Sequence, residues 1–126
     1  MKFFVAPYDL PLVVPFTTAH ATVARRRGLL VALADDNHIG YGEVAPMPGW
    51  TPIGVEQANA MLRRAIAKVE EGRDFAEVLD ELETSPEVRA GLSGAAADLA
   101  AHGQGLPLAR SLDADSLETV AVNAVV

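Results

Sequence analysis

The sequence lacks cysteine altogether, contains only two lysines and has few aromatic residues. Without cysteine it can form no disulfide, thiolate nucleophile or cysteine-bound zinc site, so any chemistry must rest on carboxylates, histidine, lysine or arginine. The first nine residues also contain no apolar run long enough for a signal peptide or a membrane span. These absences predict a soluble, cytoplasmic protein with no membrane partner.

Positive charge is scarce as well. The chain carries 10 Lys and Arg against 17 Asp and Glu, which gives a net charge of −7 and an isoelectric point near 4.8. This balance argues against a nucleic-acid partner, because phosphate binding needs a basic surface. The 126 residues suit one domain with one core, and half of them are apolar. Such an apolar composition suggests that part of the surface is not meant for contact with water.

The first 44 residues predict three antiparallel strands. Apolar side chains alternate through residues 10–16, while Pro7 and Pro11 remove ladder donors, so this strand is expected at an edge or with a bulge. A compact apolar run covers residues 28–34, and residues 39–43 resume an extended pattern after a polar turn.

Residues 45–52 are predicted to form a loop, since they contain three prolines and a glycine. A helix is expected over residues 55–69, with Thr51 and Pro52 as its cap and first turn and Gly72 as its stop.

Two further helices are predicted. Asp74 caps a short helix, and Ser85 and Pro86 open a longer one that ends at Gly103. The longer helix carries a stripe of small residues, which allows another backbone to approach closely.

The last eight residues, 119–126, have strong strand propensity and are apolar on both faces. A strand of this kind belongs inside a parallel sheet, for which the chain has no residues left. The predicted fold class is therefore α+β, a three-stranded antiparallel meander followed by a layer of three helices, with one unpartnered strand at the end.

No catalytic set can be assembled from these residues. His38 is expected in solvent in a hairpin turn, and His102 at the last carbonyls of its helix. His20 lies on a loop, where both a ligand contact and ordinary packing are open. The Gly-x-Gly of residues 40–42 lacks the third glycine and the helix of a nucleotide site.

Two other features stay open. Arg25, Arg26 and Arg27 alternate faces of a strand, so they form either a solvated edge or an anion-attracting one. Met47 and Trp50 are large apolar residues on a proline-stiffened loop, which suits a pocket lid and equally suits a loop pinned to the core.

Several motifs carry a resemblance that extends over nearly the whole chain. Gly-x-Gly-Glu-x-x-Pro at residues 40–46 is followed by Pro-Gly-Trp-Thr at residues 48–51, and residues 28–31, 96–100 and 105–108 fit the same pattern. Together they resemble the N-terminal capping domain of the enolase superfamily, in its muconate-lactonizing branch, and within it the o-succinylbenzoate synthases of menaquinone biosynthesis. Residues 120–124 are similar to the first strand of the barrel in these enzymes.

The resemblance implies a two-domain enzyme. Residues 1–117 would be the capping domain, and residues 118–126 would begin a (β/α)₈ barrel that needs about 250 residues. In this family the barrel holds Mg²⁺ and the proton-abstracting lysines, so no catalytic residue and no Mg²⁺ ligand are expected in this chain. The implied reaction is a metal-assisted loss of water from a succinyl-hydroxycyclohexadiene carboxylate, through an enediolate.

The resemblance also implies two capping loops, residues 16–20 and residues 47–50. Their role would be to enclose a small carboxylate substrate and exclude water. The residues it assigns to substrate binding are Phe16, Thr17, Thr18, His20, Met47, Pro48 and Trp50. The partner of the cap would be the barrel domain of the same polypeptide. Without the barrel, an apolar docking face of the cap would be exposed to solvent, so the isolated chain is expected to self-associate.

Two alternatives remain at the level of the sequence. The cap could serve another muconate cycloisomerase-like enzyme, or an epimerase of N-acylamino acids or dipeptides. It could also be a stand-alone binding domain that uses the same loops for recognition.

Overall fold

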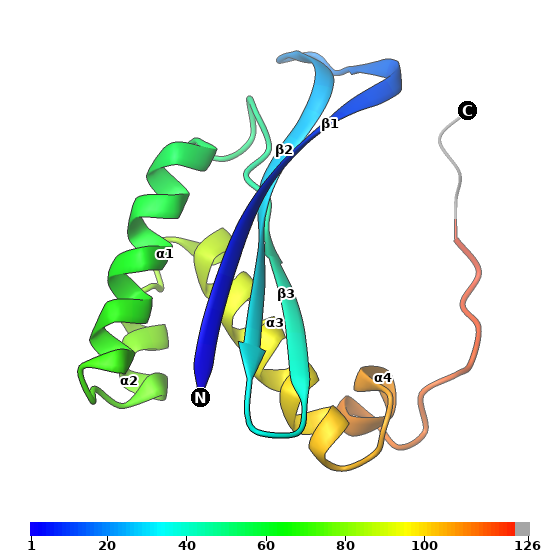
Figure 1. Cartoon of the computed structure of the whole chain (residues 1–126). Coiled ribbons are helices and arrows are strands. Elements are labelled where there is room, and N and C mark those ends of the chain that lie inside the picture. Colours follow the sequence, from blue (N-terminus) through cyan, green and yellow to red (C-terminus); the bar gives the residue numbers. More distant parts are fainter. Residues whose placement is uncertain (123–126) are drawn as a thin grey trace.

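The computed structural model describes residues 1–122 and consists of one antiparallel sheet packed against helices (Figure 1). The chain runs through β1 (Lys2–Thr17), β2 (Thr22–Ala34), β3 (Ile39–Val44), α1 (Val55–Glu70), α2 (Phe75–Asp80), α3 (Pro86–Gly103) and α4 (Leu108–Leu112). In Figure 1, α1 and α2 lie to one side of the sheet, and residues 113–122 rise on the other side. The predicted α+β class is confirmed, with α4 as a short addition that the sequence did not predict.

The sheet has the order β1-β2-β3 and antiparallel neighbours. Its first pairing runs from Lys2 opposite Ala34 to Pro11 opposite Arg25, and after a register shift resumes with Phe16 opposite Val23. Prolines cannot donate to the ladder, which is why β1 is an edge strand and why its pairing is interrupted. The sequence predicted an edge position or a bulge, and the strand has both.

The predicted turn between β2 and β3 is also confirmed. The Asp35 carboxylate accepts hydrogen bonds from the backbone N–H groups of Asn37 (2.8 Å) and His38 (2.7 Å). An aspartate that accepts hydrogen bonds from the backbone N–H groups two and three residues later stabilises a tight turn.

The start of α1 differs from the prediction. The helix begins at Val55 with Gly54 as its N-cap, and Thr51 and Pro52 stay in the loop. The Thr51 hydroxyl is engaged within that loop, where it lies 3.1 Å from the carbonyl oxygen of Met47, so it is not placed to cap the helix.

The other two predicted helices begin as expected. Asp74 caps α2 by accepting from the backbone N–H groups of Ala76 and Glu77. Ser85 and Pro86 stand at the start of α3, which ends at Gly103.

The core lies between β2 and the helices. Leu29, Val31 and Leu33 point from β2 into a buried cluster with Leu62 of α1 and Leu92 of α3. Successive strand residues point to opposite faces, so β2 alternates between this core and the outer face of the sheet. The outer face exposes a row of apolar residues, Phe4, Leu30, Ile39 and Tyr41.

His102 does not serve the last carbonyls of its own helix, as was predicted. Its Nδ1 lies 2.6 Å from the carbonyl oxygen of Ile39, and the Asp98 carboxylate accepts a 2.8 Å hydrogen bond from the backbone N–H of Tyr41. β3 is an edge strand whose outward polar groups need partners, and α3 supplies them.

The predicted final strand is only partly within the described residues. Residues 119–122 form no strand pair in the described part of the chain, and residues 123–126 lie outside it. Among residues 1–122, no helix has the length and hydrophobicity needed to traverse a lipid bilayer.

Candidate functional site

The first loop of the site, residues 18–21, joins β1 to β2 and is organised by one side chain. The Thr18 hydroxyl oxygen accepts hydrogen bonds from the backbone N–H groups of His20 (3.2 Å) and Ala21 (3.1 Å). The Thr18 backbone N–H donates to the carbonyl of Ala21 at 2.9 Å. A threonine that bonds its neighbouring backbone in this way replaces strand pairing by a tight turn.

The second loop, residues 45–54, joins β3 to α1 and is organised by one carbonyl group. The carbonyl oxygen of Met47 accepts from the backbone N–H groups of Trp50 and Thr51, each at 3.0 Å, and from the Thr51 hydroxyl at 3.1 Å. Gly49 has a positive φ of 81° within this turn, a conformation that glycine adopts without strain.

The two loops touch at Gly49. A Cβ atom at this position would lie 3.3 Å from Cβ of Ala21 and 3.4 Å from Cβ of His20. Glycine is therefore required here for two reasons, its backbone conformation and the closeness of the first loop. The contact brings together two segments that lie almost 30 positions apart in the sequence.

A cavity of about 450 Å³ opens where the loops meet. It is lined by Phe16, Thr18, Val23, Met47, Pro48, Trp50 and Thr51. The lining contains no charged side chain, and its only hydroxyl groups belong to Thr18 and Thr51. Trp50 is 70% exposed, so a large part of the indole is free to cover a ligand.

The structure brings together five of the seven residues that the resemblance assigned to the site. Phe16, Thr18, Met47, Pro48 and Trp50 line the cavity, whereas the side chains of Thr17 and His20 do not. Strand alternation explains Thr17, since its hydroxyl points away from Thr18 and pairs with the Thr22 hydroxyl at 3.2 Å. His20 is exposed and contacts the second loop at Gly49 instead.

Two residues of the lining were missed. Val23 is 6% exposed and lies opposite Phe16 across the hairpin, so the pairing register was the signal that would have found it. Thr51 was assigned to a helix cap, and only the position of the loop shows that it lines the cavity.

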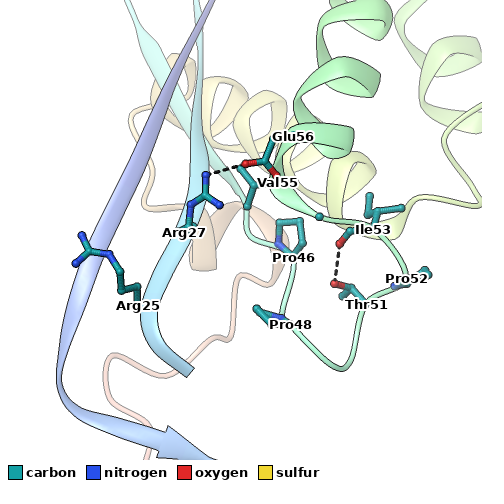
Figure 2. A pocket seen from close by; sticks show the side chains of 10 residues that line it. Arg25, Arg27, Pro46, Pro48, Thr51, Pro52, Ile53, Val55 and Glu56 are labelled. Carbon is teal, nitrogen blue, oxygen red and sulfur yellow. Dashed lines mark hydrogen bonds and ion pairs between the residues drawn. The ribbon is translucent and has the colours of Figure 1, made fainter. Parts of the chain in front are cut away.

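A second hollow, of about 330 Å³, borders the second loop (Figure 2). Pro48 and Thr51 border both hollows, so the loop forms a wall between them. Arg25 and Arg27 line this second hollow, but both are paired: Arg25 with Asp9 at 2.7 Å, and Arg27 with Glu56 at 2.8 Å. Figure 2 shows the bond from Arg27 to Glu56 at the start of α1.

The cavity between the loops fits the apolar part of a small ligand. Its lining offers no carboxylate, histidine or lysine, so it has no group for general acid or base catalysis. Mg²⁺ requires several oxygen ligands, usually including carboxylates, and residues 1–122 contain no group of three His, Asp or Glu side chains that could hold a metal. The described residues therefore do not fit a Mg²⁺ site, and what the cavity can do is bind, orient and exclude water.

Comparison with known proteins identifies a family for this chain. The family model described as "MenC, N-terminal domain" matches residues 2–99. The o-succinylbenzoate synthase of Pectobacterium atrosepticum is 30% identical over 95 residues, which cover 75% of this chain and 28% of that protein. The chain spans less than a third of the length of the curated relatives it matches.

Solved structures share the fold. The L-Ala-D/L-Glu epimerase from Bacillus subtilis matches with a TM-score of 0.76 and 22% identity, over 89% of this chain and 33% of that one. The o-succinylbenzoate synthase from Thermosynechococcus elongatus, solved with Mg in its active site, matches with a TM-score of 0.59 and 24% identity, over 80% of this chain and 30% of that one.

Proposed function

Since the chain belongs to the family of MenC N-terminal domains, we propose that it forms the substrate-covering part of an o-succinylbenzoate synthase-like enzyme. The observation that carries the proposal is the cavity between the two loops, which fits a ring or chain of hydrocarbon but supplies no catalytic group. The chain would contribute enclosure, and the reaction would take place on residues outside it.

The role of each loop follows from its chemistry. Phe16, Met47 and Trp50 would contact the apolar part of a small carboxylate substrate, which removes apolar surface from water. The loops are held by their own backbone hydrogen bonds, so a bound ligand would find this wall largely formed. With water excluded, electrostatic interactions in the reaction site strengthen.

The proposed reaction of the complete enzyme is a dehydration that gives o-succinylbenzoate, as part of menaquinone synthesis. The family match and the curated relatives support it. Mg²⁺ would be held by the remainder of that enzyme, and the remainder, a barrel beginning near residue 118, would be the partner of this domain.

A second candidate keeps the superfamily and changes the substrate to a dipeptide. It is favoured by the epimerase structures, whose TM-scores exceed that of the o-succinylbenzoate synthase structure. These structures are less than 25% identical to the chain, so they show a shared fold and do not identify the substrate. Assaying the complete protein with a succinyl-hydroxycyclohexadiene carboxylate and with L-Ala-L-Glu separates the two candidates by which substrate turns over.

Trp50→Ala in the complete protein tests the covering role. Removing the indole opens the cavity, so we expect KM to rise about ten-fold, equivalent to about 1.4 kcal/mol of lost binding. The matched control is Leu112→Ala, which truncates a similarly exposed apolar residue (73%) in α4, away from both loops. Kinetics that are equal for Trp50→Ala and the parent would remove Trp50 from the site.

A further inference from the structure

The three consecutive arginines of β2 have different partners. Arg25 and Arg27 point to the α1 side and pair with carboxylates. Arg26 points to the opposite face, as strand alternation requires. There its Nη2 donates to the carbonyl oxygen of Ala45 at 2.7 Å, and its Nη1 donates to the carbonyl oxygen of Pro46 at 2.9 Å.

These two carbonyl groups lack a sheet partner because β3 ends just before them. The last pair of the β2–β3 ladder joins Leu29 and Val44. Pro46 and Pro48 have no N–H group, so the chain cannot continue the ladder as a normal strand. Pro46 is buried and Ala45 half-buried, and unpaired carbonyl oxygens in such surroundings are destabilising. Arg26 supplies the missing donors.

The chemistry of the side chain suits this task. The guanidinium group is planar and presents several N–H donors in a fixed fork, so it can reach two successive carbonyl oxygens at once. A lysine in the same place has a compact ammonium group on a flexible stem, and it would not hold both carbonyls in one orientation.

The hydrogen bonds form a continuous path from β2 to the second loop. Arg26 fixes the carbonyls of Ala45 and Pro46, and the next residue, Met47, uses its carbonyl to hold the backbone N–H groups of Trp50 and Thr51. The backbone of the cavity wall is thus tied to the sheet through one side chain.

We propose that Arg26 is the positioning residue of the second loop. By clamping the carbonyls of residues 45 and 46, it sets the place of Met47 and Trp50 against the first loop. Its consequence for activity rests on the proposed function, since the loop must cover a substrate for its position to matter. The clamp itself is a property of this chain.

Amide relaxation of this chain by NMR tests the clamp in Arg26→Met and Arg26→Lys. We expect the order parameters of the Gly49 and Trp50 amides to fall from about 0.85 to below about 0.6 in Arg26→Met, and to fall less in Arg26→Lys, which keeps one donor group. A merely stabilising residue would lower the melting temperature without loosening this one loop. The matched control, Arg25→Met, removes the same group from the other face and should leave the loop amides unchanged.

Unchanged order parameters in Arg26→Lys and Arg26→Met, or an equal loss in Arg25→Met, would overturn the proposal. If Arg26→Met gives no folded protein, Arg26→Lys alone decides by the same readout. The complete protein provides a second measurement, in which we expect Arg26→Met to raise KM by about ten-fold. A loosened loop with unchanged KM would support the clamp and refute the covering role, so the two proposals fail separately.

Discussion

Single polar groups hold each loop in place. In the first loop the Thr18 hydroxyl and backbone replace the strand pairing that stops at Thr17. In the second loop the Met47 carbonyl gathers three donors. The two loops come close at Gly49, where a Cβ atom would lie 3.3 Å from Cβ of Ala21.

Gly49→Ala is expected to lower the free energy of unfolding and to displace the loops. A non-glycine residue in the left-handed region costs about 1 to 2 kcal/mol, and the added methyl group would also press on Ala21. Gly105→Ala is the matched control, since Gly105 has a φ of 68° with open space around it. Urea denaturation should show a loss in both variants, whereas Trp50 fluorescence should change in Gly49→Ala alone. An unchanged Trp50 spectrum there would contradict the contact.

Tyr8 should titrate well above an ordinary tyrosine. Burial, followed by the hydrogen bond that its hydroxyl donates to Glu43, raises the pKa of Tyr8 to about 12. The folded chain therefore holds this proton more tightly than the unfolded chain. The resulting stabilisation is complete below about pH 10 and is lost as the pH rises toward about 12.

The measurement uses tyrosinate absorbance in Tyr41→Phe, where Tyr8 is the only tyrosine. A midpoint near the ordinary value of about 10 would contradict both the burial of the Tyr8 hydroxyl and its bond to Glu43.

At the scale of elements, the fold depends on how closely α3 approaches β3. A Cβ atom at Gly42 would lie 2.0 Å from the carbonyl oxygen of Gly91, and one at Gly40 would lie 2.3 Å from the carbonyl oxygen of Ala95. The Gly-x-Gly pattern thus serves helix packing, and the small-residue stripe of α3 is its counterpart. Asp98 and His102 then pair with the edge of β3 across this contact.

Gly42→Ala is expected to destabilise the chain by about 1 to 3 kcal/mol or more, because the methyl group would push α3 away from the sheet. Gly94→Ala is the control on the same helix: its Cβ meets nothing within 4 Å, and replacing a helical glycine stabilises by about 0.5 to 1 kcal/mol. Opposite shifts in the urea midpoint are the expected result. A loss in both variants, or in neither, would contradict this packing.

For the whole molecule, the main feature is the apolar outer face of the sheet. Phe4 is 57% exposed, Leu30 50% and Tyr41 60%, and they lie on neighbouring strands. Contiguous exposed apolar surface of this kind favours association. The proposed partner is the remainder of the complete enzyme, and a second copy is the expected substitute in its absence.

We therefore expect this chain to self-associate at high concentration in analytical ultracentrifugation. Leu30→Lys places a charge on the central strand of the apolar face and should shift the chain toward monomer. Arg63→Glu, a charge change on the exposed side of α1, serves as the control and should not. Sedimentation as a clean monomer at all concentrations would contradict the expectation.

Most of the helices and strands could be predicted from the sequence alone, apart from α4 and the start of α1. The alternation in β1, the prolines at 7 and 11, the Asp35 turn and the cap at Asp74 act on their immediate neighbours, so each could be predicted locally. The motif around residues 40–51 was enough to indicate the superfamily. Most of the candidate site followed from the resemblance, since five of the seven residues that it assigned line the cavity.

How residues far apart in the sequence meet could not be predicted from local patterns and emerges from the packed fold. Thr17 and Thr18 are adjacent and chemically alike, yet only Thr18 lines the cavity, and Arg26 differs from Arg25 only in the face it occupies. His102 bonds the neighbouring strand β3 instead of its own helix. Thr51 stays in its loop because its hydroxyl bonds the Met47 carbonyl there. Local patterns fix conformation, whereas contacts depend on register and packing, which no short stretch of sequence contains.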